Sequence, residues 1–234
     1  MKHQASETIK LGVVLALSGG FMDAYSYLGR GGVFANAQTG NILLLGVNLA
    51  QGNFDKITRY LLPIFAFIIG VVLSLVVRSL VSKTKMHWRQ AVILIEVILF
   101  MIVAFIPQSQ NILANSMISL ACGMQVEAFR KVWGHPVATT MCIGNVRTGT
   151  ENMYYYITKK DKKCLERSLI CFLVVFTFII GAIIGDICLK YLDDYAIIVS
   201  AGILLLGVPI MIFNASDDLD DTKNNVNVKS MWNL

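Results

Sequence analysis

Residues 19–50 read GGFMDAYSYLGRGGVFANAQTGNILLLGVNLA, in which an interrupted, partly polar segment follows an apolar helix. The first part of that segment, residues 33–40 (VFANAQTG), gathers Asn36, Gln38, Thr39 and Gly40, a poor composition for a helix facing lipid. The second part, residues 41–50 (NILLLGVNLA), is apolar and as a helix would be about 15 Å long, or half a bilayer. This pattern predicts a re-entrant hairpin, in which an irregular leg enters the membrane, turns at Thr39 and Gly40, and continues as a half-helix that returns.

The composition around this segment is that of an integral membrane protein. Of the 234 residues, 56% are hydrophobic and 15% are charged, whereas a soluble domain carries about 25% charged residues. This balance argues against a soluble enzyme, a nucleic-acid-binding protein and a disordered protein. Six apolar stretches are long enough to cross a bilayer, at residues 10–28, 59–80, 90–106, 112–129, 165–189 and 195–213. We expect residues 214–234, which hold four aspartates, to form a flexible cytoplasmic tail.

The chain contains an internal repeat with an offset of 104 residues and no gap. The offset places Asp23 on Glu127 and superimposes identical residues at Gly19/Gly123, Ala24/Ala128, Val33/Val137, Gly40/Gly144 and Asn41/Asn145. It also aligns the later spans, because Arg59 maps to Lys163 and Gln90 maps to Asp194. We therefore expect two repeats, residues 1–106 and 107–213, with the second broken segment at residues 137–156.

The two broken segments leave two topologies open, and the loop charges separate them. If each segment crosses the membrane, the chain has eight spans in parallel repeats; if each enters and returns, it has six spans in inverted repeats. Cytoplasmic loops carry an excess of Lys and Arg. With Arg147 set aside, the eight-span topology divides these residues 11 against 8, and the six-span topology 15 against 4. The predicted fold is therefore an all-α membrane protein with six transmembrane helices in two inverted three-helix repeats and both termini cytoplasmic.

Two such segments entering from opposite faces would meet near the membrane midplane, where inverted-repeat transporters place their substrate sites. Asn41 and Asn145 would lie at half-helix N-termini, whose free N–H groups favour an anion or a carbonyl. We expect a substrate site built from Asn36, Thr39, Gly40, Asn41, Gly144 and Asn145. The alternative is that glycine only makes the turn and asparagine only caps the helix, with no ligand.

Charged residues within the spans are further candidates for this site. Asp23 and Glu127 occupy equivalent repeat positions, and a carboxylate within a span normally faces a cavity or a partner. The alternative is that both carboxylates extend to the lipid headgroups. Arg147 is a candidate anion contact, or the counter-ion of Glu127 or of Glu96, whose repeat mate is Ser200. Arginine and half-helix N-termini suit an anion and the carboxylates suit a cation or a proton, so the charge of the substrate stays open.

Residue types that would indicate catalysis are missing from the predicted spans. The three histidines lie at span ends, the five cysteines have no CxxC spacing, and no nucleophile–base pair, HExxH motif or phosphate-binding loop is present. We expect no enzyme activity, no cofactor, no metal and no nucleic-acid partner. Gly181 with Gly185, and Gly70 with Ser74, are small-residue pairs that allow close helix packing and also fit a homodimer interface.

The first broken segment carries a family resemblance. The motifs Gly20-Phe21-Met22-Asp23-Ala24, Gly31-Gly32-Val33-Phe34 and Asn36-Ala37-Gln38-Thr39-Gly40-Asn41 are similar to those of the YoaK-like family of uncharacterised bacterial membrane proteins. The resemblance covers roughly the whole chain and is specific mainly in residues 19–45. It implies a location in the bacterial cytoplasmic (inner) membrane. It implies no activity, because that family has no established substrate.

These observations lead to two functional hypotheses. The first is a small secondary transporter or channel-like permease for a small polar solute or ion, with its site between the two broken segments. The second is a non-transporting membrane scaffold, in which the hairpins serve only to pack the bundle or a dimer. The scaffold hypothesis predicts a dry, closed midplane with Asp23 and Glu127 paired or pointing at the headgroups, so a structure without a polar cavity there would favour it.

Overall fold

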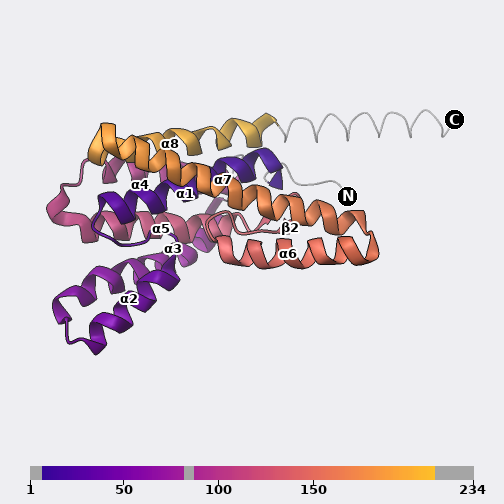
Figure 1. The fold of residues 1–234 in the computed structure, drawn as a ribbon. Coiled ribbons are helices and arrows are strands. Elements are labelled where there is room, and N and C mark those ends of the chain that lie inside the picture. The colour runs from indigo at the N-terminus through magenta and orange to yellow at the C-terminus, as the bar shows by residue number, and fades with distance from the viewer. Residues whose placement is uncertain (1–6, 82–86, 214–234) are drawn as a thin grey trace.

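The computed structural model describes residues 7–81 and 87–213, and the predicted tail at 214–234 lies outside the described residues. The described chain is almost entirely helical (Figure 1). Its α-helices are α1 (Ile9–Ala24), α2 (Gln38–Ala50), α3 (Ile57–Val81), α4 (Trp88–Val103), α5 (Asn111–Ala128), α6 (Cys142–Lys159), α7 (Lys162–Leu192) and α8 (Ile197–Leu205). A π-helical turn follows α1 (Tyr25–Gly29), 3₁₀ turns lie at Phe54–Lys56, Gln108–Gln110 and Asp193–Ala196, and β1 (Lys131–Val132) pairs with β2 (His135–Pro136) in an antiparallel hairpin.

The helices fall where the apolar stretches predicted them, with one interruption. The last predicted span, 195–213, is divided by a turn at Leu206, after which residues 207–213 are helical again. Pro209 explains the break, because it has no N–H to donate to the carbonyl of Leu205. By length and composition, three helical stretches among the described residues suffice to cross a membrane: Ile9–Gly29, Phe54–Val81 and Lys162–Phe213, the last of which contains both α7 and α8.

Two of the long helices expose apolar side chains that a soluble protein would bury. On α3, Phe65, Ile68, Ile69 and Val72 are each more than half exposed. The exposed face of α7 has the same character, with large apolar side chains at Leu169, Phe176, Ile179, Ile183 and Ile187. Exposed apolar area on this scale is typical of a surface that contacts lipid acyl chains.

Glycines bring pairs of helices into backbone contact. A Cβ atom on Gly20 of α1 would collide with the Phe178 carbonyl of α7, and one on Gly181 would collide with the Leu17 carbonyl. The same close approach joins α3 and α5. There, glycines at positions 70 and 123 face the carbonyls of residues 120 and 67 respectively. Because no side chain separates the backbones, the two helices of each pair are held together by dispersion contacts. Such contacts are needed in a bilayer, where burial of apolar side chains does not drive helices together.

The helix pairs correspond to one another at the 104-residue offset. α1 packs chiefly on α7, and α3 packs chiefly on α5. The offset maps α1 onto α5 and α3 onto α7, so it exchanges these two pairs. The pairs α2–α3 and α6–α7 exchange in the same way, as do α1–α8 and α4–α5. The first helix of each predicted repeat, α1 or α5, therefore packs chiefly on a helix of the other repeat, α7 or α3 respectively.

The helices of the two broken segments lie far apart, but their beginnings are near the middle of the bundle. In Figure 1, α2 extends from the centre toward the lower left, and α6 extends from the centre toward the opposite end. The helix boundaries differ from the prediction. α2 begins at Gln38, so Thr39 and Gly40 are helical and the turn precedes them. α6 has 18 residues and is longer than a half-helix.

Candidate functional site

The irregular leg before α2, residues 33–37 (the first leg), is attached to the middle of α1. The Asn36 side-chain amide donates to the Gly19 carbonyl at 2.6 Å. The Asn36 backbone N–H donates to the Asp23 carboxylate at 2.7 Å. Asp23 therefore holds the first leg in place, which gives a structural reason for a carboxylate inside an apolar helix.

The leg before α6, residues 137–141 (the second leg), reaches the same residue of α1. The Thr139 carbonyl lies 3.1 Å from the position that a Cβ on Gly19 would occupy. Gln125 of α5 donates to the Thr139 hydroxyl at 3.4 Å and to the Leu15 carbonyl at 3.2 Å. Because the Asn36 side chain also contacts Gly19, the two legs meet around one glycine within the bundle.

Asn41 and Asn145 make equivalent hydrogen bonds in the two halves. The Asn41 amide donates to the Phe34 carbonyl at 2.7 Å and accepts from the Phe34 N–H at 3.0 Å. The Asn145 amide donates to the Ala138 carbonyl at 2.6 Å and accepts from the Ala138 N–H at 3.3 Å. These side chains thus brace the legs from inside α2 and α6, whereas the N-cap residues are Ala37 and Met141.

Where the legs meet, buried polar atoms lack hydrogen-bond partners among the described residues. They are Asn36 Oδ1 and Gln125 Oε1, together with Thr140 Oγ1, which has no oxygen or nitrogen partner in the described part of the chain and lies beside the Cys122 thiol; we call these three atoms the central polar cluster. Their residues are at most 2% exposed. A buried polar atom without a partner lowers the stability of a protein by about 1–3 kcal/mol, so such atoms are explained either by a bound molecule or by a function. The sequence pointed to Asn36 but not to Gln125 or Thr140, whose repeat mates, Phe21 and Asn36, differ from them.

The other predicted site residues lie around this cluster in varied settings. Thr39 is exposed, Gly40 packs against the Phe34 ring, and nothing lies within 4 Å of a Cβ built on Gly144. Arg147 is exposed, and no carboxylate of the described residues forms an ion pair with it. The carboxylate of Glu127 pairs with Arg130 at the end of α5.

Glu96 is a second buried polar feature of the bundle. Its side chain on α4 is fully buried, and neither carboxylate oxygen has a hydrogen-bond partner among the described residues. Its repeat mate Ser200, on α8, shares a hydrogen bond of 2.8 Å with the Ser18 hydroxyl of α1. A carboxyl group in such a place is costly when charged, so we expect Glu96 to carry a proton.

Arg30 is an important residue that sequence reasoning missed. The sequence places Arg30 in the loop after the first predicted span, where an exposed side chain is expected, yet its side chain is fully buried. Its guanidinium donates to the Ile106 carbonyl at 2.8 Å, the Val103 carbonyl at 3.1 Å and the Tyr25 hydroxyl at 2.9 Å. It also forms an ion pair of 3.5 Å with Asp194. Arg30 therefore joins the ends of α1 and α4 to the turn before α8.

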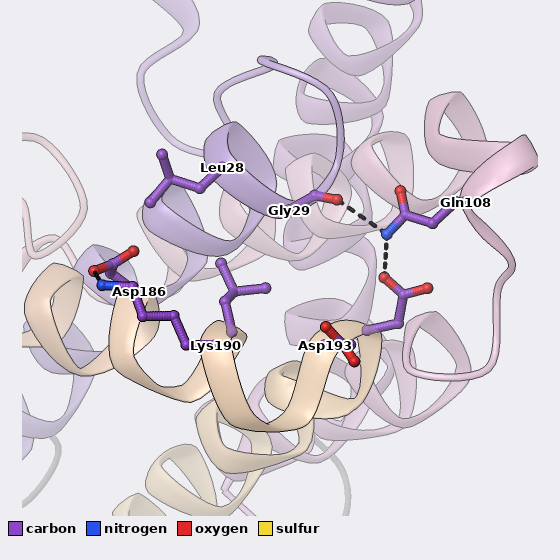
Figure 2. Close-up of a pocket in the computed structure, with 8 residues that line it drawn as sticks. Leu28, Gly29, Gln108, Asp186, Lys190 and Asp193 are labelled. Carbon is purple, nitrogen blue, oxygen red and sulfur yellow. Dashed lines mark hydrogen bonds and ion pairs between the residues drawn. The ribbon is translucent and has the colours of Figure 1, made fainter.

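Beside Arg30 lies a surface pocket of about 320 Å³, which Figure 2 shows; we call it the outer pocket after the face on which the predicted six-span topology would place it. It is lined by Leu28, Gly29, Gln108, Asp186, Leu189, Lys190, Asp193 and Asp194. Gln108 bridges its two walls, because its amide donates to the Gly29 carbonyl at 3.0 Å and to the Asp194 carboxylate. Lys190 is paired with Asp186, and Asp194 with Arg30. Asp193 is therefore the carboxylate of the pocket that forms no ion pair with the described residues, and it makes this end acidic.

Comparison with known proteins gives a family and no activity. Residues 11–210 match the family model described as protein of unknown function, DUF1275. The chain is 27% identical over 205 residues to the UPF0700 transmembrane protein YoaK of Bacillus subtilis strain 168, a match that covers 82% of this chain and 88% of that protein. No solved structure matches the chain.

Proposed function

Because the chain belongs to the DUF1275 family of unknown function and is a membrane protein, we propose a function from its own geometry. The proposal is a small secondary transporter or channel-like permease for a small polar solute or ion, in the bacterial inner membrane. Its path would pass through the central polar cluster, between the two legs. The chain would cross the membrane six times in two inverted repeats, with both termini cytoplasmic.

Contacts between loops support six spans over eight. Arg30 contacts both the Ile106 carbonyl and Asp194, so the ends of α1, α4 and α7 lie together. Six spans put all three ends on the outer face, whereas eight spans put the end of α4 on the opposite face from the other two. At the other end of the bundle, Glu7 pairs with Arg89 at 3.8 Å. Six spans put these two residues on the same face, and eight spans separate them.

The observation that carries the transport proposal is the central polar cluster itself. Irregular backbone inside a membrane is tolerated where it is buried in protein or lines a cavity, and both legs contribute polar atoms to one place. A purely structural contact would pair those atoms, since a buried unpaired polar atom is destabilising. Asn36 Oδ1 and Gln125 Oε1 are unpaired and Thr140 Oγ1 meets only the weak Cys122 thiol among the described residues, so all three can contact a solute in transit.

Thr140→Val tests this proposal, because it removes one hydroxyl of the central polar cluster and keeps the shape of the side chain. Purified protein in liposomes is assayed for flux of ammonium, potassium, formate, urea and glycerol. We expect flux of the transported probe to fall about three- to tenfold, the value of one hydrogen bond to the solute. The melting temperature should change little, because the side-chain partner of the hydroxyl is the Cys122 thiol, a weak hydrogen-bonding group.

The matched control is Thr177→Val. The Thr177 hydroxyl donates to the Leu173 carbonyl within its own helix at 2.8 Å and is not an unpaired group, so flux should be unchanged. Flux that Thr140→Val leaves intact would move the path away from the cluster. If no probe crosses faster than in empty liposomes, the scaffold hypothesis is favoured.

A further inference from the structure

A second pocket, of about 150 Å³, lies where α3 and α5 end and α4 begins. We call it the inner pocket, because it is at the end of the bundle opposite the outer pocket. It is lined by Arg78, His87, Trp88, Arg89, Glu127, Ala128 and Arg130. Three arginines in so small a volume indicate affinity for an anion.

The arginines of the inner pocket are held in place by contacts that leave positive charge in excess. The guanidinium carbons of Arg78 and Arg89 lie over the Trp88 ring, at 5.4 and 5.2 Å from its centroid. Arg89 also donates to the Ala128 carbonyl at 2.8 Å. Stacking on an aromatic ring orients a guanidinium without neutralising it.

Carboxylates balance only part of this charge. Glu127 pairs with Arg130, and Glu7 pairs with Arg89 at 3.8 Å. Burial, and then the positive charge of Arg89, lowers the pKa of His87, so this histidine is uncharged at neutral pH. No carboxylate of the described residues pairs with Arg78, whose guanidinium is therefore the available cation of the pocket.

The outer pocket shows that this charge is not imposed by the fold. It is lined by the ends of α7 and α1 and the start of α8, the elements that the 104-residue offset matches to α3, α5 and α4. Where the inner pocket has Arg89, the outer pocket has Asp193. Two pockets of matching origin thus carry opposite charges (Figure 2 shows the acidic one).

We propose that the inner pocket binds a phosphate group, which accepts hydrogen bonds from Arg78 and Arg89 in the fork geometry that guanidinium groups favour. The ligand is a phosphate ester of an anionic phospholipid headgroup or a free phosphate. The lipid source is favoured by position, because α3 and α5 end here and α4 begins here, next to exposed apolar side chains of α3 such as Leu80. The proposal is independent of any transport activity.

Arg78→Gln tests the proposal on the full-length protein, with two arms. In the first, native mass spectrometry follows binding of phosphatidylglycerol and of phosphatidylcholine to protein in detergent. In the second, thermal unfolding is followed with inorganic phosphate against chloride at equal ionic strength. We expect phosphatidylglycerol binding to weaken about fivefold, as expected for one basic residue at a membrane surface, and Arg78→Lys to recover part of the loss.

Lys162→Gln is the control, because Lys162 is exposed at the start of α7 and the substitution removes the same charge outside the pocket. It should bind phosphatidylglycerol as the unaltered protein does. A response to inorganic phosphate alone, lost in Arg78→Gln, would support the pocket with a soluble ligand. Equal behaviour of Arg78→Gln and Lys162→Gln in both arms would overturn the proposal.

Discussion

Arg30 makes more stabilising contacts than its position in a loop would predict. Gly31 and Gly32 follow it with φ of 86° and 77°, conformations that favour glycine, and they turn the chain back toward the first leg. The guanidinium can then reach the Ile106 carbonyl and the Val103 carbonyl at the end of α4, the second of which also accepts from the Ile106 N–H at 3.1 Å. One side chain thereby satisfies helix-end carbonyls that lipid could not.

Replacing Arg30 with glutamine should destabilise the protein by about 3 kcal/mol, because the Ile106 carbonyl and the Tyr25 hydroxyl would lose their donor and Asp194 would lose its ion-pair partner. Thermal unfolding of the purified protein in detergent measures the effect. Arg147→Gln is the control, since Arg147 is exposed and forms no ion pair with the described residues, and it should leave the melting temperature unchanged. Equal melting temperatures for the two variants would contradict the role given to Arg30.

For single residues, the sequence predicted which positions are equivalent better than it predicted what their side chains contact. The repeat identified Asn41 and Asn145 as equivalent, and the structure gives them equivalent hydrogen bonds. It could not reveal that their partners are backbone groups seven residues earlier, since that depends on the path of each leg. The burial of Arg30 could not be predicted from the sequence, because it depends on three helix ends that converge from distant parts of the chain.

Among the helices, the closest contacts depend on glycine. Gly181 of α7 was predicted to allow close packing as part of a small-residue pair, and its partner is the backbone of α1 at Leu17. The sequence could not identify that partner, because a small residue shows that another helix can approach closely but does not show which helix it is. The same limit applies to Gly70, which packs against α5.

The substitution Gly181→Ala should destabilise the protein by about 1–3 kcal/mol, because the added methyl group meets a backbone carbonyl that cannot move away. The same change at Gly202 of α8, where nothing lies within 4 Å of the new atom, should be neutral or stabilise by up to about 1 kcal/mol through helix propensity. Denaturation of both variants in the same detergent gives the comparison. A loss of stability at Gly202 equal to that at Gly181 would refute the packing explanation.

For the molecule as a whole, loop charge and loop contacts lead to the same topology by independent routes. The charge count uses residues dispersed along the chain, while the contacts of Arg30 and Arg89 depend on a few atoms. Two of the six predicted spans are weaker by composition, since α4 has only 16 residues and α5 contains Asn115, Ser119 and Gln125. Neither is among the three helical stretches of the described residues that suffice by length and composition to cross a membrane. Both helices lie against other helices, which relaxes the need for an apolar surface.

Cysteine labelling in intact cells tests this topology. In a background without native cysteines, Lys56→Cys should react with a membrane-impermeant maleimide added outside, while Lys131→Cys and Lys160→Cys should not. An eight-span chain would give the reverse result at Lys56 and Lys131. If neither cysteine reacts in intact cells but both react equally after lysis, both topologies are wrong. Lys131 and Lys160 are exposed at the surface of the molecule, so accessibility itself is not limiting.

The exchange of partners between the two halves has a consequence for biosynthesis. α1 finds its backbone contact on α7, roughly 160 residues later, which at ribosomal speed is a delay on the order of ten seconds. During that time the first half is inserted but lacks its main partner, with the bare glycine face of α1 exposed to lipid or to the insertion machinery. Neither half is thus a folding unit, and a nascent chain that stalls midway would be a substrate for membrane proteases.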